Sequence, residues 1–124
     1  MSVTRDPTLR VVPRPEDINS NGHIFGGWIL AQMDIAAGIV SGRRARGPVA
    51  TVAVDAMKFL QPILMGDVLS VYAQVERVGR TSMAVKVEVV AHRKRGTTEV
   101  PVTEGVFTMV ALGDDGRPKP VDAA

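Results

Sequence analysis

One apolar segment, from Phe25 to Val40, constrains the fold more than any other, and its only charged residue is Asp34. Its length is typical of a helix rather than a strand. We expect this helix to begin at Ile24 or Phe25, to run to about Ser41 and to end at Gly42. A carboxylate in the middle of an otherwise apolar helix calls for a chemical or structural reason.

After Gly47-Pro48 the apolar residues recur at every second position in four successive runs, a spacing typical of β-strands. A short apolar run before the helix predicts a fifth strand. The last run is apolar on both faces from Val106 onward, so we expect it to lie centrally or at a subunit contact. Short connections between the four runs predict antiparallel hairpins. The expected strands are residues 8–12, 49–60, 67–78, 81–93 and 99–112.

This order of elements predicts an α+β protein in which one helix packs on one curved antiparallel sheet. With 124 residues the chain is expected to form a single domain over residues 1–124, with loose termini at 1–7 and 114–124. Only 4% of the residues are aromatic, so aliphatic side chains must build the core. A small core with one helix favours oligomerisation.

The composition argues against several functions. A net charge of +2 is too small to imply nucleic-acid binding. Without cysteine, disulfides and thiolate metal sites are impossible, and His23 and His92 alone do not suggest a structural zinc site. Residues 1–7 do not read as a secretory signal, and the apolar segment is too short to cross a membrane. We therefore expect a cytoplasmic protein with no metal and no membrane partner.

The helix entry carries a recognisable motif. The run Asp17-Ile-Asn-Ser-Asn-Gly-His-Ile-Phe-Gly-Gly-Trp-Ile-Leu-Ala-Gln-Met-Asp34 closely resembles the corresponding motif of YciA-type acyl-CoA thioesterases, and the resemblance covers nearly the whole chain. Weaker matches lie at Phe59-Leu-Gln-Pro62, Gly66-Asp67, Gly79-Arg-Thr-Ser82 and Gly116-Arg-Pro118.

The resemblance implies the hotdog fold, a long central helix wrapped by a five-stranded curved antiparallel sheet. It also implies hydrolysis of acyl-CoA to a free acid and CoA, with no cofactor apart from the coenzyme A of the substrate. The active site of that family lies between the two subunits of a homodimer, and such dimers often assemble as trimers of dimers.

Asp34 matches the family carboxylate that serves as general base or nucleophile. The residues themselves support this, because burial on an apolar helix would raise the pKa of Asp34 toward the range of a useful base. The alternative is structural: Asp34 pairs across a subunit interface or caps a neighbouring backbone group.

Gly26 and Gly27 match the family positions whose backbone N–H groups bind the thioester carbonyl. The first N–H groups of a helix lack intrahelical partners and carry the positive end of its dipole, which suits an oxyanion hole. Close packing of the helix on the sheet is the alternative. Gly27 and Asp34 should share one face, about 10 Å apart along the axis. We therefore expect the base of one subunit to act with the glycines of the other.

His23 departs from the family pattern, in which Asp or Asn is usual. In a catalytic role, His23 would contact the substrate carbonyl, orient water or act as a general acid. In a structural role, it would only cap the helix or lie in a surface turn. In the second case its role passes to Asn19 or Asn21. His92, near a strand end among basic residues, is expected on the surface.

The phosphates of coenzyme A suit arginine and lysine, which form charge-assisted hydrogen bonds. For each candidate residue the alternative is that it is a solvated side chain at the edge of a strand. The expected phosphate-binding residues are Arg80, Thr81, Ser82, Arg93 and Lys94. The acyl tunnel is expected from Ile29, Met33, Met57 and Phe59, which otherwise belong to the core.

Two other functions stay open from the sequence alone. A non-catalytic hotdog module would bind acyl-CoA without cleaving it, although pure binding does not need the charge of Asp34. A hotdog hydratase or dehydratase usually requires an Asp–His pair in a different local motif, and His23 alone does not supply that pair.

Overall fold

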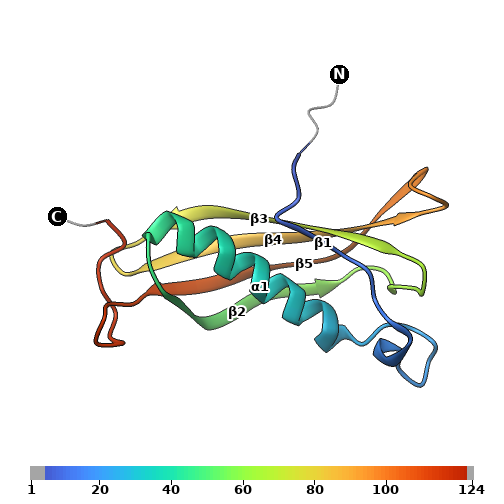
Figure 1. Ribbon diagram of the computed structural model, residues 1–124, viewed down its shortest axis with the longest axis horizontal. Helices are drawn as coiled ribbons and strands as arrows, with labels where there is room; N and C mark the ends of the chain where they lie inside the picture. The colour runs from blue at the N-terminus through green and yellow to red at the C-terminus, as the bar shows by residue number, and fades with distance from the viewer. Residues whose placement is uncertain (1–4, 123–124) are drawn as a thin grey trace.

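The computed structural model describes residues 5–122 and contains one α-helix, one short 3-10 helix and five strands (Figure 1). The helix crosses one face of the sheet, as predicted. In chain order the elements are β1 (Leu9–Val11), η1 (Pro15–Asp17), α1 (Gly26–Ala45), β2 (Val49–Phe59), β3 (Val68–Val78), β4 (Ser82–Arg93) and β5 (Thr98–Ala111).

The sheet has the order β1-β3-β4-β5-β2, and every pair is antiparallel. Hairpins join β3 to β4 and β4 to β5, as expected. The expected hairpin between β2 and β3 is wrong, because β2 pairs with β5 at the opposite edge, from Val49 against Ala111 to Phe59 against Thr103. Residues 60–67 form an irregular connection instead. This order places β5, which is apolar on both faces, inside the sheet rather than at its edge.

Helix α1 extends past the predicted end at Ser41 to Ala45. Arg46 stops it in a left-handed conformation (φ 56°), and its N–H donates to the carbonyl of Gly42, which therefore lies inside the helix. Arg43 and Arg44 favour the longer helix, since cations in the last turn interact well with the helix dipole.

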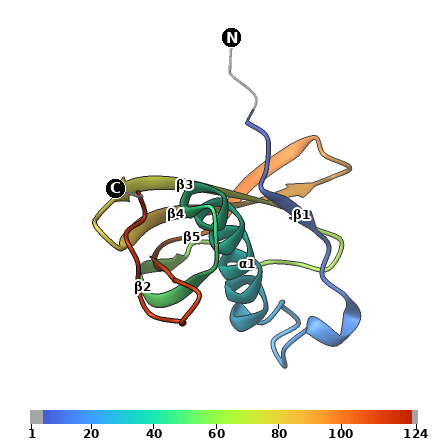
Figure 2. The same ribbon diagram turned by 60° about the vertical axis from the view of Figure 1, so that its left-hand side comes forward.

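The core lies between α1 and the concave face of the sheet, and Figure 2 shows the same layers after a rotation. The buried helix positions recur at helical spacing, while Asp34 and Ile35 point away from the sheet centre. No helix within residues 5–122 is long and apolar enough to cross a membrane. The buried helix residues are Ile29, Met33, Ala36, Ala37, Ser41 and Ala45.

Strand β2 is an edge strand that is exposed on both faces in the single chain. Its pairing with β5 is interrupted twice, and Ala56 takes a positive φ of 52° at the second irregularity. Val52 and Val54 remain 58% and 40% exposed. A long apolar edge strand pairs readily with another chain unless it is covered.

The expectation of a loose C-terminal segment is wrong for residues 114–122. The N–H of Lys119 donates to the carbonyl of Ala111, the N–H of Val121 donates to the carbonyl of Arg80, and Val121 is buried. At the other end, Arg5 lies 4.0 Å from the centre of the Tyr72 ring. Residues 1–4 and 123–124, also expected to be loose, lie outside the described residues.

Candidate active site

Asp34 is held by Thr51, a residue that the sequence did not single out. The Thr51 hydroxyl on β2 donates to Oδ1 of Asp34 at 2.5 Å and lies 3.4 Å from Sδ of Met109. The prediction that Asp34 is buried is wrong for the single chain, since the side chain is exposed. Successive helix residues are rotated by about 100°, so burial of Met33 turns Asp34 toward the β2 edge.

A cavity of about 330 Å³ surrounds this carboxylate and has mostly apolar walls. Gly27 lies two turns earlier on the same face of α1, as its spacing predicted, and it borders the same cavity. A Cβ added at Gly27 would meet no atom within 4 Å, so there is open space beside this residue. The lining residues are Gly27, Leu30, Ala31, Asp34, Thr51, Val54 and Phe107.

A second cavity, of about 340 Å³, lies at the helix entry and brings together Asn19, His23 and Gly26. The side-chain oxygen of Asn19 accepts the backbone N–H groups of Asn21 (2.9 Å) and His23 (3.1 Å). Asn19 therefore shapes the turn that carries His23. The other lining residues are Ile24, Ile29, Phe59, Leu60, Gln61, Pro62, Ile63 and Thr103.

The two glycines at the start of α1 differ in their surroundings. The helix has no side-chain cap at Phe25, and within residues 5–122 no acceptor is placed on the N–H groups of Gly26 and Gly27. A Cβ at Gly26 would meet the Phe59 ring at 3.2 Å, whereas Gly27 has open space. Close packing against Phe59 therefore accounts for Gly26, whereas packing does not account for Gly27.

The residues expected to bind phosphates lie at two ends of the sheet. Arg80, Thr81 and Ser82 precede or begin β4, and Arg93 ends it. Twelve residues of strand span about 36 Å at about 3.3 Å per residue. One chain therefore does not bring both groups to one coenzyme.

Arg93 is already engaged by its own chain. Its guanidinium donates to Asp67 at 2.9 and 3.1 Å and to the carbonyl of Pro62 at 2.7 Å, while Lys94 is exposed in the following turn. The expectation that His92 lies on the surface is wrong, because its ring is mostly buried and lies 2.7 Å from the Ser70 hydroxyl.

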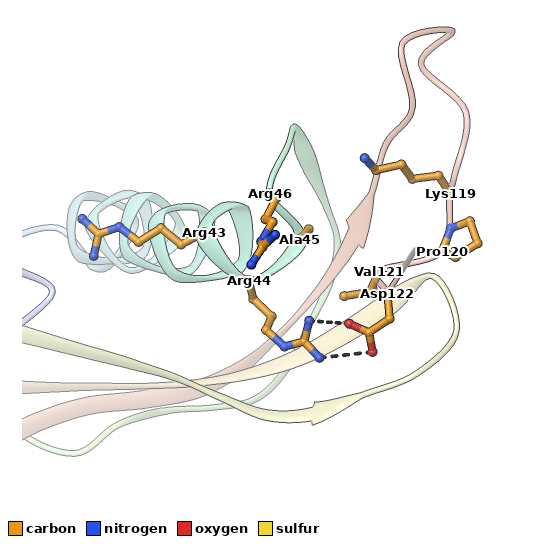
Figure 3. Close-up of a pocket in the computed structure, with 8 residues that line it drawn as sticks. All are labelled: Arg43, Arg44, Ala45, Arg46, Lys119, Pro120, Val121 and Asp122. Carbon is orange, nitrogen blue, oxygen red and sulfur yellow. Dashed lines mark hydrogen bonds and ion pairs between the residues drawn. The ribbon is translucent and has the colours of Figure 1, made fainter. Parts of the chain in front are cut away.

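A third cavity, of about 740 Å³, lies at the other end of α1 and is strongly basic (Figure 3). Its lining includes Arg43, Arg44, Arg46 and Lys119, far along the helix from Asp34. Two hydrogen bonds, of 2.6 and 3.2 Å, join Arg44 to Asp122. The hydrogen bond from Arg44 lowers the pKa of Asp122, and the same bond raises the pKa of Arg44.

The Arg44–Asp122 pair should give a small, pH-dependent contribution to stability. Because the pKa of Asp122 is lowered on folding, this contribution is present above the unfolded-state pKa and is lost as the pH falls through the folded pKa. Asp122→Asn should lower the midpoint of thermal unfolding slightly at neutral pH and not in strong acid. Asp114→Asn, in an exposed turn, is the control. An equal difference at both pH values would contradict the assignment.

Comparisons with known proteins show which family the chain belongs to. The sequence model of the thioesterase superfamily matches residues 21–97. The acyl-CoA thioester hydrolase YciA of Salmonella typhimurium is 42% identical over 117 residues, which cover 91% of this chain and 87% of that protein.

Two solved structures are similar throughout. The hexameric thioesterase of Yersinia pestis has a TM-score of 0.89 and 40% identity, covering 96% of this chain and 97% of that one. The hexameric hotdog fold thioesterase of Campylobacter jejuni has a TM-score of 0.89 and 38% identity, covering 95% and 91%. The chain therefore belongs to the thioesterase superfamily and has the hotdog fold that its helix-entry motif implies.

Proposed function

We propose that the protein hydrolyses acyl-CoA thioesters to a free acid and CoA. One observation carries this proposal: the exposed Asp34–Thr51 pair lies in the same cavity as Gly27, which has open space beside it. A base and an unpaired helix N–H are the groups that thioester hydrolysis requires. The name of the YciA relative supports CoA thioesters as the substrate class.

In the proposed reaction, Asp34 takes a proton from water while the water oxygen attacks the carbonyl carbon. Thr51 holds one carboxylate oxygen, so the other is available to the water. N–H groups at the start of α1 stabilise the oxyanion. The C–S bond then breaks, and the leaving sulfur takes up the proton from Asp34.

A direct attack by Asp34 on the carbonyl carbon is the other route. It expels the thiolate and forms a mixed anhydride, which water then cleaves. A single turnover in ¹⁸O-labelled water tests for the anhydride route, because label enters the Asp34 carboxylate only when water attacks the Asp34 carbon of that anhydride.

We further propose a homodimer as the minimal active unit, formed by antiparallel pairing of two β2 edges. The exposed Val52 and Val54 on β2 and the exposed Ile35 on α1 support this, since a second copy would cover them. Such pairing would set the Asp34 cavity of one chain beside the His23 cavity of its partner. The two similar structures are named hexameric, which supports three such dimers in the full assembly.

The direct test is thiol release from acetyl-, butyryl- and palmitoyl-CoA. We expect turnover of at least one of these substrates. Tight binding of all three without thiol release would instead identify a non-catalytic acyl-CoA-binding module.

Gly27→Ala should separate activity from stability. Alanine is favoured over glycine in helices by up to about 1 kcal/mol, and open space surrounds Gly27, so the thermal midpoint should stay equal or rise. The new methyl group would occupy space in the Asp34 cavity, where we place the substrate, and would displace the thioester, so kcat/KM should fall by about 10-fold or more. Gly26→Ala gives a contrasting result for stability alone, because its methyl group meets Phe59 and should lower the midpoint. Full activity in Gly27→Ala would remove this glycine from the site.

A further inference from the structure

Thr103 on β5 has a hydroxyl group without a partner. The residue is 2% exposed and stands opposite Phe59 of β2 and Val89 of β4. Within residues 5–122, its Oγ1 is the one buried side-chain oxygen or nitrogen with no hydrogen bond. Buried hydroxyls nearly always have a partner, because an unpaired one destabilises the fold. Valine has almost the same shape and would avoid this destabilisation.

The surroundings of Thr103 indicate what the hydroxyl meets. It lines the helix-entry cavity together with His23 and Gly26, while most of the other lining residues are apolar. Gly26 lines the same cavity, and its N–H has no acceptor within residues 5–122. Two residues that each carry an unpaired donor therefore line one cavity of about 340 Å³.

We propose that Thr103 is a substrate-binding residue whose hydroxyl donates a hydrogen bond to the carbonyl oxygen of the acyl thioester. This inference rests on the proposed function, since it takes an acyl-CoA as the ligand. A carbonyl oxygen has two lone pairs and can accept from both the N–H of Gly26 and the O–H of Thr103. A methylene chain in the same place would leave the hydroxyl unpaired. The cavity thus receives the carbonyl segment, and the alkyl tail leaves it in another direction.

The test compares Thr103→Val, which removes only the hydroxyl, with Thr103→Ser, which keeps it. The probe is a ketone analogue of butyryl-CoA, in which a methylene group separates sulfur from the carbonyl, so that it binds without being cleaved. Isothermal titration calorimetry should show about 3- to 10-fold weaker binding for Thr103→Val. Thr103→Ser should stay within about twofold of the wild type. The free Thr103→Val protein should melt at the same or a higher temperature, because it no longer buries an unpaired hydroxyl.

The outcomes are separable from those of the proposed function. If the wild type binds the analogue more tightly than Thr103→Val but cleaves no acyl-CoA, the hydrolase proposal fails and the role of Thr103 stands. Equal affinity of the two proteins, or no binding by the wild type, overturns the role of Thr103. So does a Thr103→Val protein that unfolds or melts lower, since the hydroxyl would then be structural. Tighter binding of a palmitoyl ketone by Thr103→Val would place the alkyl tail in this cavity and also overturn it.

Discussion

Asp34→Asn should lower kcat for acyl-CoA hydrolysis by about 10²- to 10⁴-fold, the usual loss on removing a general base. Asparagine keeps the size of the side chain, and its oxygen can still accept the hydrogen bond from Thr51. It cannot take a proton from water. Because Asp34 is exposed and Thr51 is its only hydrogen-bond partner within residues 5–122, the thermal midpoint should change little.

The measurement is the initial rate of thiol release at saturating substrate, with the thermal midpoint of each protein recorded beside it. Asp114→Asn removes a surface carboxylate from the turn after β5 and should retain the wild-type rate. If Asp34→Asn kept more than about a tenth of wild-type kcat, neither the general-base nor the nucleophile role would stand.

The elements of this fold follow from local patterns, but the sheet order does not. An apolar segment of helical length predicted α1, and two-residue alternation predicted the strands to within a few residues. The predicted pairing of β2 with β3 was wrong because hairpin reasoning considers only strands that are neighbours in sequence. The pairing of β2 with β5 depends on covering β5, which is a property of the whole sheet. The end of α1 was missed because Gly42 was taken as a stop, although Gly47-Pro48 follows it.

The candidate site divides in the same way. Asp34, Gly26 and Gly27 lie in one contiguous motif, so the sequence could predict them together. Thr51 could not be found, because its contact with Asp34 depends on where β2 lies beside α1. Thr103 could not be found either, since only the packed structure shows that its hydroxyl is buried and unpaired.

The structure also refines the expectation of which subunit supplies the base and which supplies the helix N–H groups. The sequence suggested one clamp at Gly26 and Gly27, distant from the base. In the structure, Gly27 shares the cavity of Asp34, whereas Gly26 shares the cavity of His23. A shared site would therefore join the Asp34–Gly27 cavity of one chain to the His23–Gly26 cavity of its partner.

Two inactive variants should restore activity to each other if the site is shared. Asp34→Ala removes the base, and His23→Trp fills the helix-entry cavity, so each protein alone should be inactive. In an unbiased co-expressed mixture, half of the dimers are heterodimers, and each has one intact site. The expected rate is therefore about one quarter of the wild-type rate per subunit. A site contained within one chain would give no recovery.

Co-expression of the wild type with the double variant, Asp34→Ala with His23→Trp, gives the converse result. In a shared site every heterodimer is inactive, because each of its sites receives one damaged half. Only the wild-type homodimers contribute, so the mixture should reach about one quarter of the wild-type rate. A site within one chain would instead keep about one half, since each wild-type subunit would work independently of its partner. A shared site therefore predicts a gain of activity in the first mixture and an extra loss of activity in the second. Only a site built between two chains gives both results.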